Sequence, residues 1–199
     1  IDMVQGNPVP LEPRLSLGWK TDLIFAHFDA QVIDRGQYLV VRTPHSPEFW
    51  WGNFVLFGDA PREGEAARWM AVFNAEIATR LPACRHLTFG VDSTSEVVLP
   101  PDFAALGLTL SVTTVLTQQR NQLCEATRPL GEAYSVRPLR LPEEAEIAVQ
   151  CQVECDEGEN EMPGYRRFRE HQMARYAAMQ QVGLGHWFGV FAHTESVKL

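Results

Sequence analysis

The chain has 199 residues, of which 45% are hydrophobic and 21% charged, and its formal net charge is −8. This composition is ordinary for a globular protein, and no apolar run approaches the ~20 residues that a membrane-spanning helix needs. Binding of a nucleic-acid phosphate backbone needs a basic surface, so the negative net charge leads us to expect no nucleic-acid partner. The same charge favours a cationic or amine ligand.

The four cysteines, Cys84, Cys124, Cys151 and Cys155, show no disulfide-framework spacing. This fits a reducing compartment, and no secretory signal is visible, so we expect a cytoplasmic protein that binds no membrane. Cys151 and Cys155 lie one turn apart in an expected helix. A metal site would need two further ligands of matching geometry, so we expect no metal.

The N-terminal part predicts an extended arm, a hairpin and a strand. Residues 3–18 are proline-rich and lack a period. Residues 21–28 suit a short helix, although Leu23–Phe25 would equally suit a strand. Two β-branched runs, 31–34 and 38–43, flank Arg35–Gly36 and indicate a hairpin. Residues 53–57 form an apolar strand that a turn at 58–61 ends.

The next elements alternate between helix and strand. Apolar residues at three- and four-residue spacing predict an amphipathic helix over 63–81. We then expect a strand at 86–92, a short helix at 101–106 ended by Gly107, and a strand at 109–117. Residues 118–133 are polar, contain Pro129 and Gly131, and form the best linker in the chain.

The last third reads as a strand (134–140), an acidic helix, a basic helix (165–181) and a second strand (186–192). A polar turn, His193–Ser196, follows, and a third strand is expected to begin before the chain ends at Leu199.

This order, opened by Val136-Arg137-Pro138-Leu139, resembles the front half of the GNAT superfamily of N-acetyltransferases. Phe103-Ala104-Ala105-Leu106-Gly107-Leu108 is similar to the F-x-x-x-G-F ending of many GNAT domains. The resemblance implies an α/β (α+β) GNAT-like acyl-CoA N-acyltransferase fold with a mixed central sheet flanked by helices. It implies tandem units: a degenerate one over 1–117, the linker 118–133, and the front half of a second over 134–199.

The resemblance also implies an enzyme that moves an acetyl or other acyl group from acetyl-CoA, its cofactor, to an amine acceptor. GNAT enzymes hold the CoA pyrophosphate in an R/Q-x-x-G-x-G/A loop between a strand and a helix N-terminus, where free N–H groups meet the anion. Residues 58–65 have this location but are acidic, and Pro61 has no N–H. Residues 180–185, Gln-Gln-Val-Gly-Leu-Gly, match the letters but follow a helix, so we interpret them as a helix stop.

We therefore assign no catalytic or cofactor-binding residue and expect the cofactor loop after Leu199. On this view the 199 residues alone are inactive.

The resemblance implies that the loop joining the acidic and basic helices helps to shape the acceptor site. Residues 143–162 hold eight acidic side chains and no Lys or Arg. An acidic lip would concentrate an ammonium-bearing acceptor, so we name as substrate-binding candidates Glu157, Glu159, Glu161 and Tyr165. The alternative is a solvated charge run, which the arginines of the basic helix would neutralise.

Two other features carry weaker signals. Phe49-Trp50-Trp51 is expected to pack between strand and helix, with a ligand groove or subunit contact as the alternative. The histidines show no metal spacing, and only His45 and His86 are candidates for a base.

Two rival interpretations remain open. One is a non-catalytic GNAT-like binding or dimerisation module, which could act as a homodimer. The other is a single mixed domain in which the C-terminal half completes the first sheet.

Overall fold

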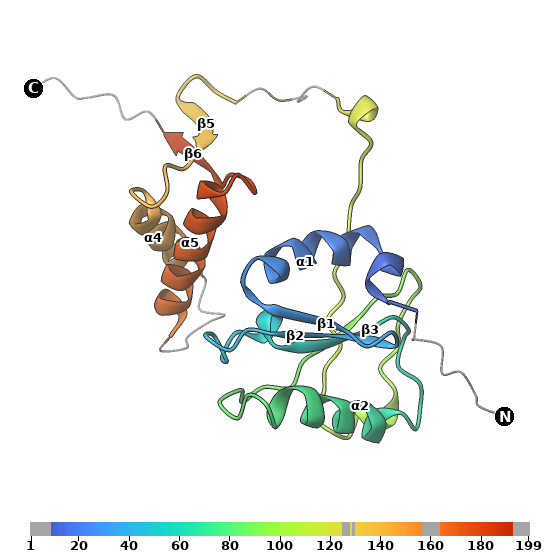
Figure 1. The fold of residues 1–199 in the computed structure, drawn as a ribbon. Helices are drawn as coiled ribbons and strands as arrows, with labels where there is room; N and C mark the ends of the chain where they lie inside the picture. Colours follow the sequence, from blue (N-terminus) through green and yellow to red (C-terminus); the bar gives the residue numbers. More distant parts are fainter. Residues whose placement is uncertain (1–8, 125–127, 129, 157–163, 193–199) are drawn as a thin grey trace, which may run out of the picture. The chain divides into compact units, whose positions relative to one another are not determined.

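The computed structural model describes residues 9–124, 128, 130–156 and 164–192 (Figure 1). The chain divides into two compact units, Ile1–Thr117 and Gln118–Leu199, here called unit 1 and unit 2. The described residues of the expected linker, 118–133, are all exposed.

Unit 1 is built on a four-stranded mixed sheet of order β1-β2-β3-β4. The β1–β2 and β2–β3 pairs are antiparallel, and the β3–β4 pair is parallel. The first two strands form the predicted hairpin, in which Gly36 adopts a φ of 80° that favours glycine. The strands are β1 (Gln31–Asp34), β2 (Tyr38–Arg42), β3 (Phe54–Phe57) and β4 (Phe89–Val91).

Helices cover both faces of this sheet (Figure 1). On one face, α1 (Leu17–Asp29) and the preceding 3₁₀ turn Glu12–Arg14 surround a core that includes Leu39, Val41 and Leu56. On the other face, α2 (Ala66–Phe73) and α3 (Pro101–Ala104) enclose an aromatic core. Within that core the rings of Phe57 and Trp69 stack with centroids 3.7 Å apart.

The first helix begins earlier than predicted. It starts at Leu17 after Ser16, whose backbone N–H donates to the Asp92 carboxylate at 2.7 Å. Thr21 therefore lies inside the helix, where its hydroxyl donates to the Leu17 carbonyl at 2.8 Å. The alternative strand at Leu23–Phe25 is wrong, because a helix buries Leu23 and Ala26 together on the sheet.

The predicted helix over 63–81 is shorter and changes its geometry. It begins at Ala66, because Gly64 takes a φ of 86° in the preceding turn. It ends at Phe73 and continues as a π-helical turn, Asn74–Ala78. The short helix before Gly107 ends as expected, with Gly107 at a φ of 77°.

The predicted strand over 109–117 is wrong. These residues are rich in β-branched side chains, but they pair with no strand in the described part of the chain, and all of them are exposed. β-Propensity reflects packing on a sheet more than an intrinsic backbone preference. Val115 shows where the segment runs: its side chain lies over Gly18 of α1, where a Cβ would be 2.7 Å from it.

Unit 2 consists of a two-stranded antiparallel sheet and two helices. The elements are β5 (Tyr134–Pro138), α4 (Ala145–Glu154), α5 (Tyr165–Gln181) and β6 (Phe188–Ala192). One face of the sheet packs on the helices through a core that includes Leu139, Val149 and Met173. The opposite face exposes apolar side chains in cross-strand pairs: Val136 opposite Val190, and Pro138 opposite Phe188.

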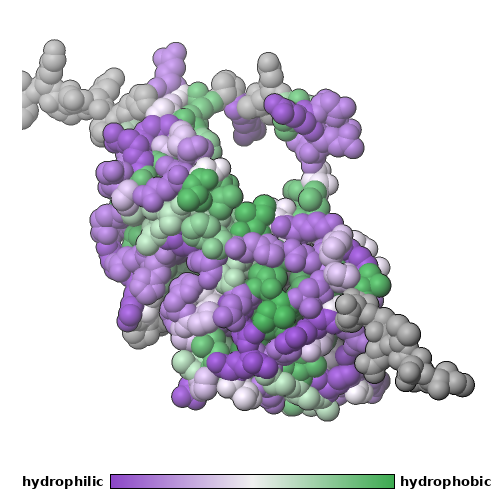
Figure 2. All heavy atoms as spheres, viewed as in Figure 1, coloured by the Kyte–Doolittle hydropathy of each residue, from purple (hydrophilic) through white to green (hydrophobic). Residues whose placement is uncertain are grey.

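The molecule is therefore a mixed α/β protein with two separate sheets in its described residues. The alternative in which the C-terminal half completes the first sheet is wrong, since β5 and β6 pair only with each other there. Apolar as well as hydrophilic residues reach the surface (Figure 2). No helix of the described residues has the length and apolar character to cross a bilayer.

Candidate functional site

The turn between β3 and α2 contains residues 58–65, which have the location of an anion-binding loop between a strand and a helix. A side chain from elsewhere in unit 1 fills this turn. The Asp102 carboxylate, from α3, accepts from the backbone N–H groups of Gly64 and Ala66, each at 3.0 Å. The Arg62 N–H donates to the Glu65 carboxylate at 3.1 Å. The donors that would meet a phosphate are thus engaged by carboxylates.

The glycines of this turn have structural roles. A Cβ at Gly58 would lie 2.7 Å from Leu11 Cδ1, so the glycine allows close packing of the N-terminal segment. Gly64 provides the left-handed turn before α2. The turn caps α2 and offers no open cradle for pyrophosphate.

The second match to the CoA loop pattern lies at the C-terminal end of α5. Gly183 adopts a φ of 78°, and its N–H donates to the Gln180 carbonyl at 3.1 Å. The Leu184 N–H donates to the Met179 carbonyl at 3.0 Å. These bonds belong to a helix C-cap at the negative end of the dipole, as expected for a helix stop.

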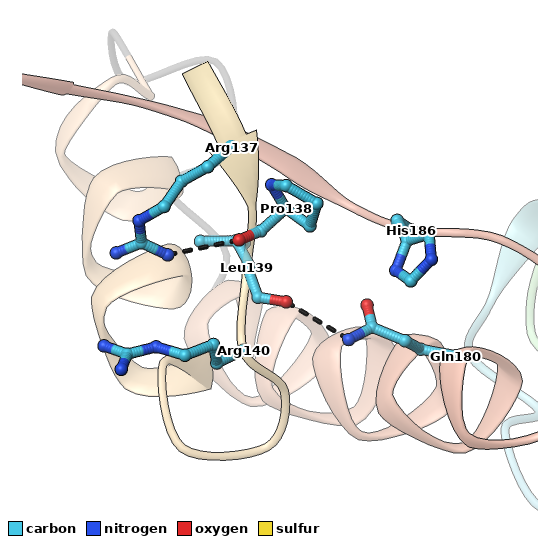
Figure 3. Close-up of a pocket in the computed structure, with 6 residues that line it drawn as sticks. All are labelled: Arg137, Pro138, Leu139, Arg140, Gln180 and His186. Atoms are coloured by element: carbon cyan, nitrogen blue, oxygen red, sulfur yellow. Dashed lines mark hydrogen bonds between the residues drawn. The ribbon is translucent and has the colours of Figure 1, made fainter. Parts of the chain in front are cut away.

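A shallow groove of about 520 Å³ lies in unit 2, where the end of β5 meets the last turn of α5 (Figure 3). Gln180 anchors it: its side-chain Nε2 donates to the Leu139 carbonyl at 3.1 Å. The Gln180 Oε1 is buried and has no hydrogen-bond partner among the described residues. The lining residues are Arg137, Pro138, Leu139, Arg140, Gln180 and His186.

The two arginines of the groove turn their guanidinium groups away from Gln180 and His186 (Figure 3). Both donate to Glu144, whose buried carboxylate also accepts from the Arg140 backbone N–H at 2.7 Å. The Arg137 guanidinium also lies 3.7 Å from the Phe191 ring centre. These arginines join β5 to the start of α4, so their first role is structural.

The predicted acceptor-binding residues are only partly described. Glu157, Glu159 and Glu161 lie outside the described residues. Tyr165 begins α5, and its hydroxyl accepts from Arg169 Nε at 2.9 Å and Nη2 at 2.6 Å. The structure therefore places Tyr165 in a contact within α5.

The basic helix also pairs across to α4. Arg166 contacts Glu146 and donates to the Glu170 carboxylate at 3.1 Å. These ion pairs are largely exposed and neutralise part of the acidic surface.

The aromatic run before β3 differs from the expected core packing. Trp50 and Trp51 lie in a 3₁₀ turn, Trp50–Gly52, and are 57% and 56% exposed. Fully buried Asn53 fixes this turn: its side chain accepts from the Thr43 N–H at 2.8 Å and donates to the Ser46 and Phe49 carbonyls. Trp51 still packs between helix and strand, with its ring centre 6.4 Å from that of Trp19 in α1 and 5.9 Å from that of Phe54 in β3, so the expected packing is met in part and more than half of each tryptophan stays exposed.

His86 lies beside this loop, in a pairing with Cys84 that sequence reasoning missed. The His86 ring stacks on Trp50, contacts the Asn53 carbonyl through Nε2 at 3.2 Å and lies 3.5 Å from Cys84 Sγ. Burial lowers the pKa of His86 and raises the pKa of Cys84. Because the thiol is held protonated, the pair is not an activated nucleophile.

The second candidate base, His45, lies 3.6 Å from the Asp29 carboxylate at an exposed position. Within the described ranges, no group of three or more His, Cys, Asp or Glu side chains could hold a metal ion.

None of the known protein families, curated proteins or solved structures compared with this chain matches it.

Proposed function

We propose that the chain carries two GNAT-like units and that unit 2 contributes to an N-acyltransferase, which moves an acyl group from CoA to an amine acceptor. Unit 1 is then a non-catalytic copy. The acceptor amine would attack the thioester directly, and acetyl-CoA would be the donor.

The open apolar face of the β5–β6 sheet is the observation that carries this proposal. A two-stranded sheet with one uncovered apolar face is marginal by itself. The front half of a larger sheet domain would present such a face to its remaining elements. The order β5, α4, α5, β6, with β5 and β6 antiparallel neighbours, supports the same interpretation.

Unit 1 supports its own part of the proposal through the Asp102 carboxylate. This side chain takes the backbone donors at the start of α2, which is the position that pyrophosphate would need. A copy that retains the strand–helix–strand arrangement but fills the anion position with its own carboxylate would leave the CoA pyrophosphate no backbone donors there.

A non-catalytic binding or dimerisation module is the second candidate. The closed turn before α2 and the exposed Trp50 and Trp51 favour it. In that case both units would act as platforms and neither would bind CoA.

Calorimetric titration with acetyl-CoA separates the two candidates. We expect the protein to bind acetyl-CoA with a stoichiometry of one per chain, because only unit 2 takes part. Absence of binding heat at any concentration up to millimolar would exclude the acyltransferase and leave the binding module.

A further inference from the structure

Arg42, the last residue of β2, is a buried arginine whose side-chain Nε has no hydrogen-bond partner within the described residues. The residue is 9% exposed. Strand alternation places its side chain on the same face as Val40, which packs in the core with Ile77 of the π-helical turn. Arg42 therefore lies at the end of α2 opposite the turn that Asp102 closes.

The neighbours of Arg42 hold more positive than negative charge. Glu76 is bound by Arg35 through Nε at 2.9 Å and Nη2 at 3.2 Å, and Arg80 Nε lies 3.9 Å from its Oε2. Arg42 interacts electrostatically with all three of these residues. Among the charged groups that interact with Arg42, Glu76 is thus the one carboxylate beside two further arginines, in a chain of net charge −8.

The excess positive charge around Arg42 destabilises the fold when no anion is bound. An arginine remains charged at any physiological pH, and a buried charge needs a counter-charge or hydrogen bonds. Burial lowers the pKa of Arg42, and the nearby Arg80 lowers it further. Among the described residues, the hydrogen bonds to the Glu76 carboxylate come from Arg35 and Tyr38 and none comes from Arg42.

We propose that Arg42, with Arg80 and Arg35 beside it, binds an oxyanion: the carboxylate or phosphate group of a small ligand. The guanidinium fork matches both groups in geometry, and Glu76 orders the surrounding arginines through its pair with Arg35. The site is independent of the proposed acyl transfer, since it belongs to unit 1.

Calorimetric titration of the full chain with inorganic phosphate and with acetate, in chloride buffer of matched ionic strength, tests the site. We expect saturable binding of at least one of the two anions. Arg42→Met should weaken that binding by about tenfold or more, the loss of one charge-assisted bond. Arg80→Ala should weaken binding as well, because it removes a positive charge beside Arg42. This variant should fold normally, since the Arg80 side chain is exposed and can be removed without opening the core. Stronger binding of phosphate identifies a phosphate group, and stronger binding of acetate identifies a carboxylate.

Arg62→Ala is the control, because Arg62 is an exposed arginine of the same unit outside the cluster. Loss of binding in this variant equal to that in Arg42→Met would show a non-specific charge effect and overturn the proposal. So would the absence of saturable binding of either anion to the wild-type chain.

Stability in chloride buffer provides a second measurement. Arg42→Met should be at least as stable as the wild type there, because an apolar side chain replaces an unpaired buried charge. A marked loss of stability would show that Arg42 is satisfied within the fold, and would also overturn the site.

Discussion

At the residue scale, Glu144 is the polar centre of unit 2. Its carboxylate is 7% exposed and accepts from Arg137 Nη1 and Nη2, both at 2.8 Å, and from Arg140 Nη2 at 2.8 Å. Hydrogen bonds from Arg137 and then Arg140 hold the pKa of Glu144 well below its ordinary value. A buried carboxylate with two guanidinium partners ties the end of β5 to the start of α4.

This arrangement predicts a pH dependence of stability. Because the folded pKa of Glu144 is lowered, the unfolded chain takes up a proton first, near pH ~4.3, and the folded state loses stability as the pH falls below that value. Glu144→Gln should lower the free energy of unfolding at pH 7. It should also make the free energy of unfolding decrease less steeply as the pH falls below ~4.3. Urea unfolding at a series of pH values, with exposed Glu143→Gln as the matched control, measures both effects. An unchanged acid dependence in Glu144→Gln would contradict the role of this carboxylate.

At the element scale, the sequence predicts those parts whose signals are local. The hairpin follows from two β-branched runs around Arg35–Gly36, and β1 has the expected bounds, Gln31–Asp34. Residues 109–117 have the same β-branched character but find no partner strand in the described structure, which no local pattern could reveal.

The site residues that sequence reasoning missed depend on distant contacts. Asp102 lies 36 residues from Ala66, whose N–H it accepts, so the spacing within the turn gives no sign of it. The acidic residues within the turn did indicate that the turn would repel a phosphate group. In the same way, Arg42 and Glu76 come together only when β2 packs under the π-helical turn.

The Asp102 cap predicts a specific loss of stability in unit 1. Asp102→Ala should lower the free energy of unfolding by about 1 kcal/mol, the typical value of a helix cap, because the backbone donors of Gly64, in the turn, and Ala66, at the start of α2, lose their acceptor. Asp102→Asn retains an acceptor oxygen and should lose less. Urea unfolding followed by circular dichroism measures the effect, and Asp59→Ala, an exposed carboxylate of the same turn, should change stability by less than about 0.5 kcal/mol. Equal effects of the Asp102 and Asp59 substitutions would contradict the cap.

At the scale of the whole molecule, the two units differ in what they leave open. Unit 1 covers both faces of its sheet and closes the start of α2 with its own carboxylate. In the described part of unit 2, helices cover one face of the sheet, and the other face exposes apolar pairs. On the proposed function, unit 1 is therefore a finished, non-catalytic module, and cofactor binding belongs with unit 2.

Hydrogen exchange of the protein, measured by mass spectrometry with and without acetyl-CoA, tests this division most directly. We predict that acetyl-CoA slows exchange in peptides from unit 2 and leaves the turn between β3 and α2 unchanged. Protection of that turn, or protection confined to unit 1, would contradict the assignment of cofactor binding to unit 2.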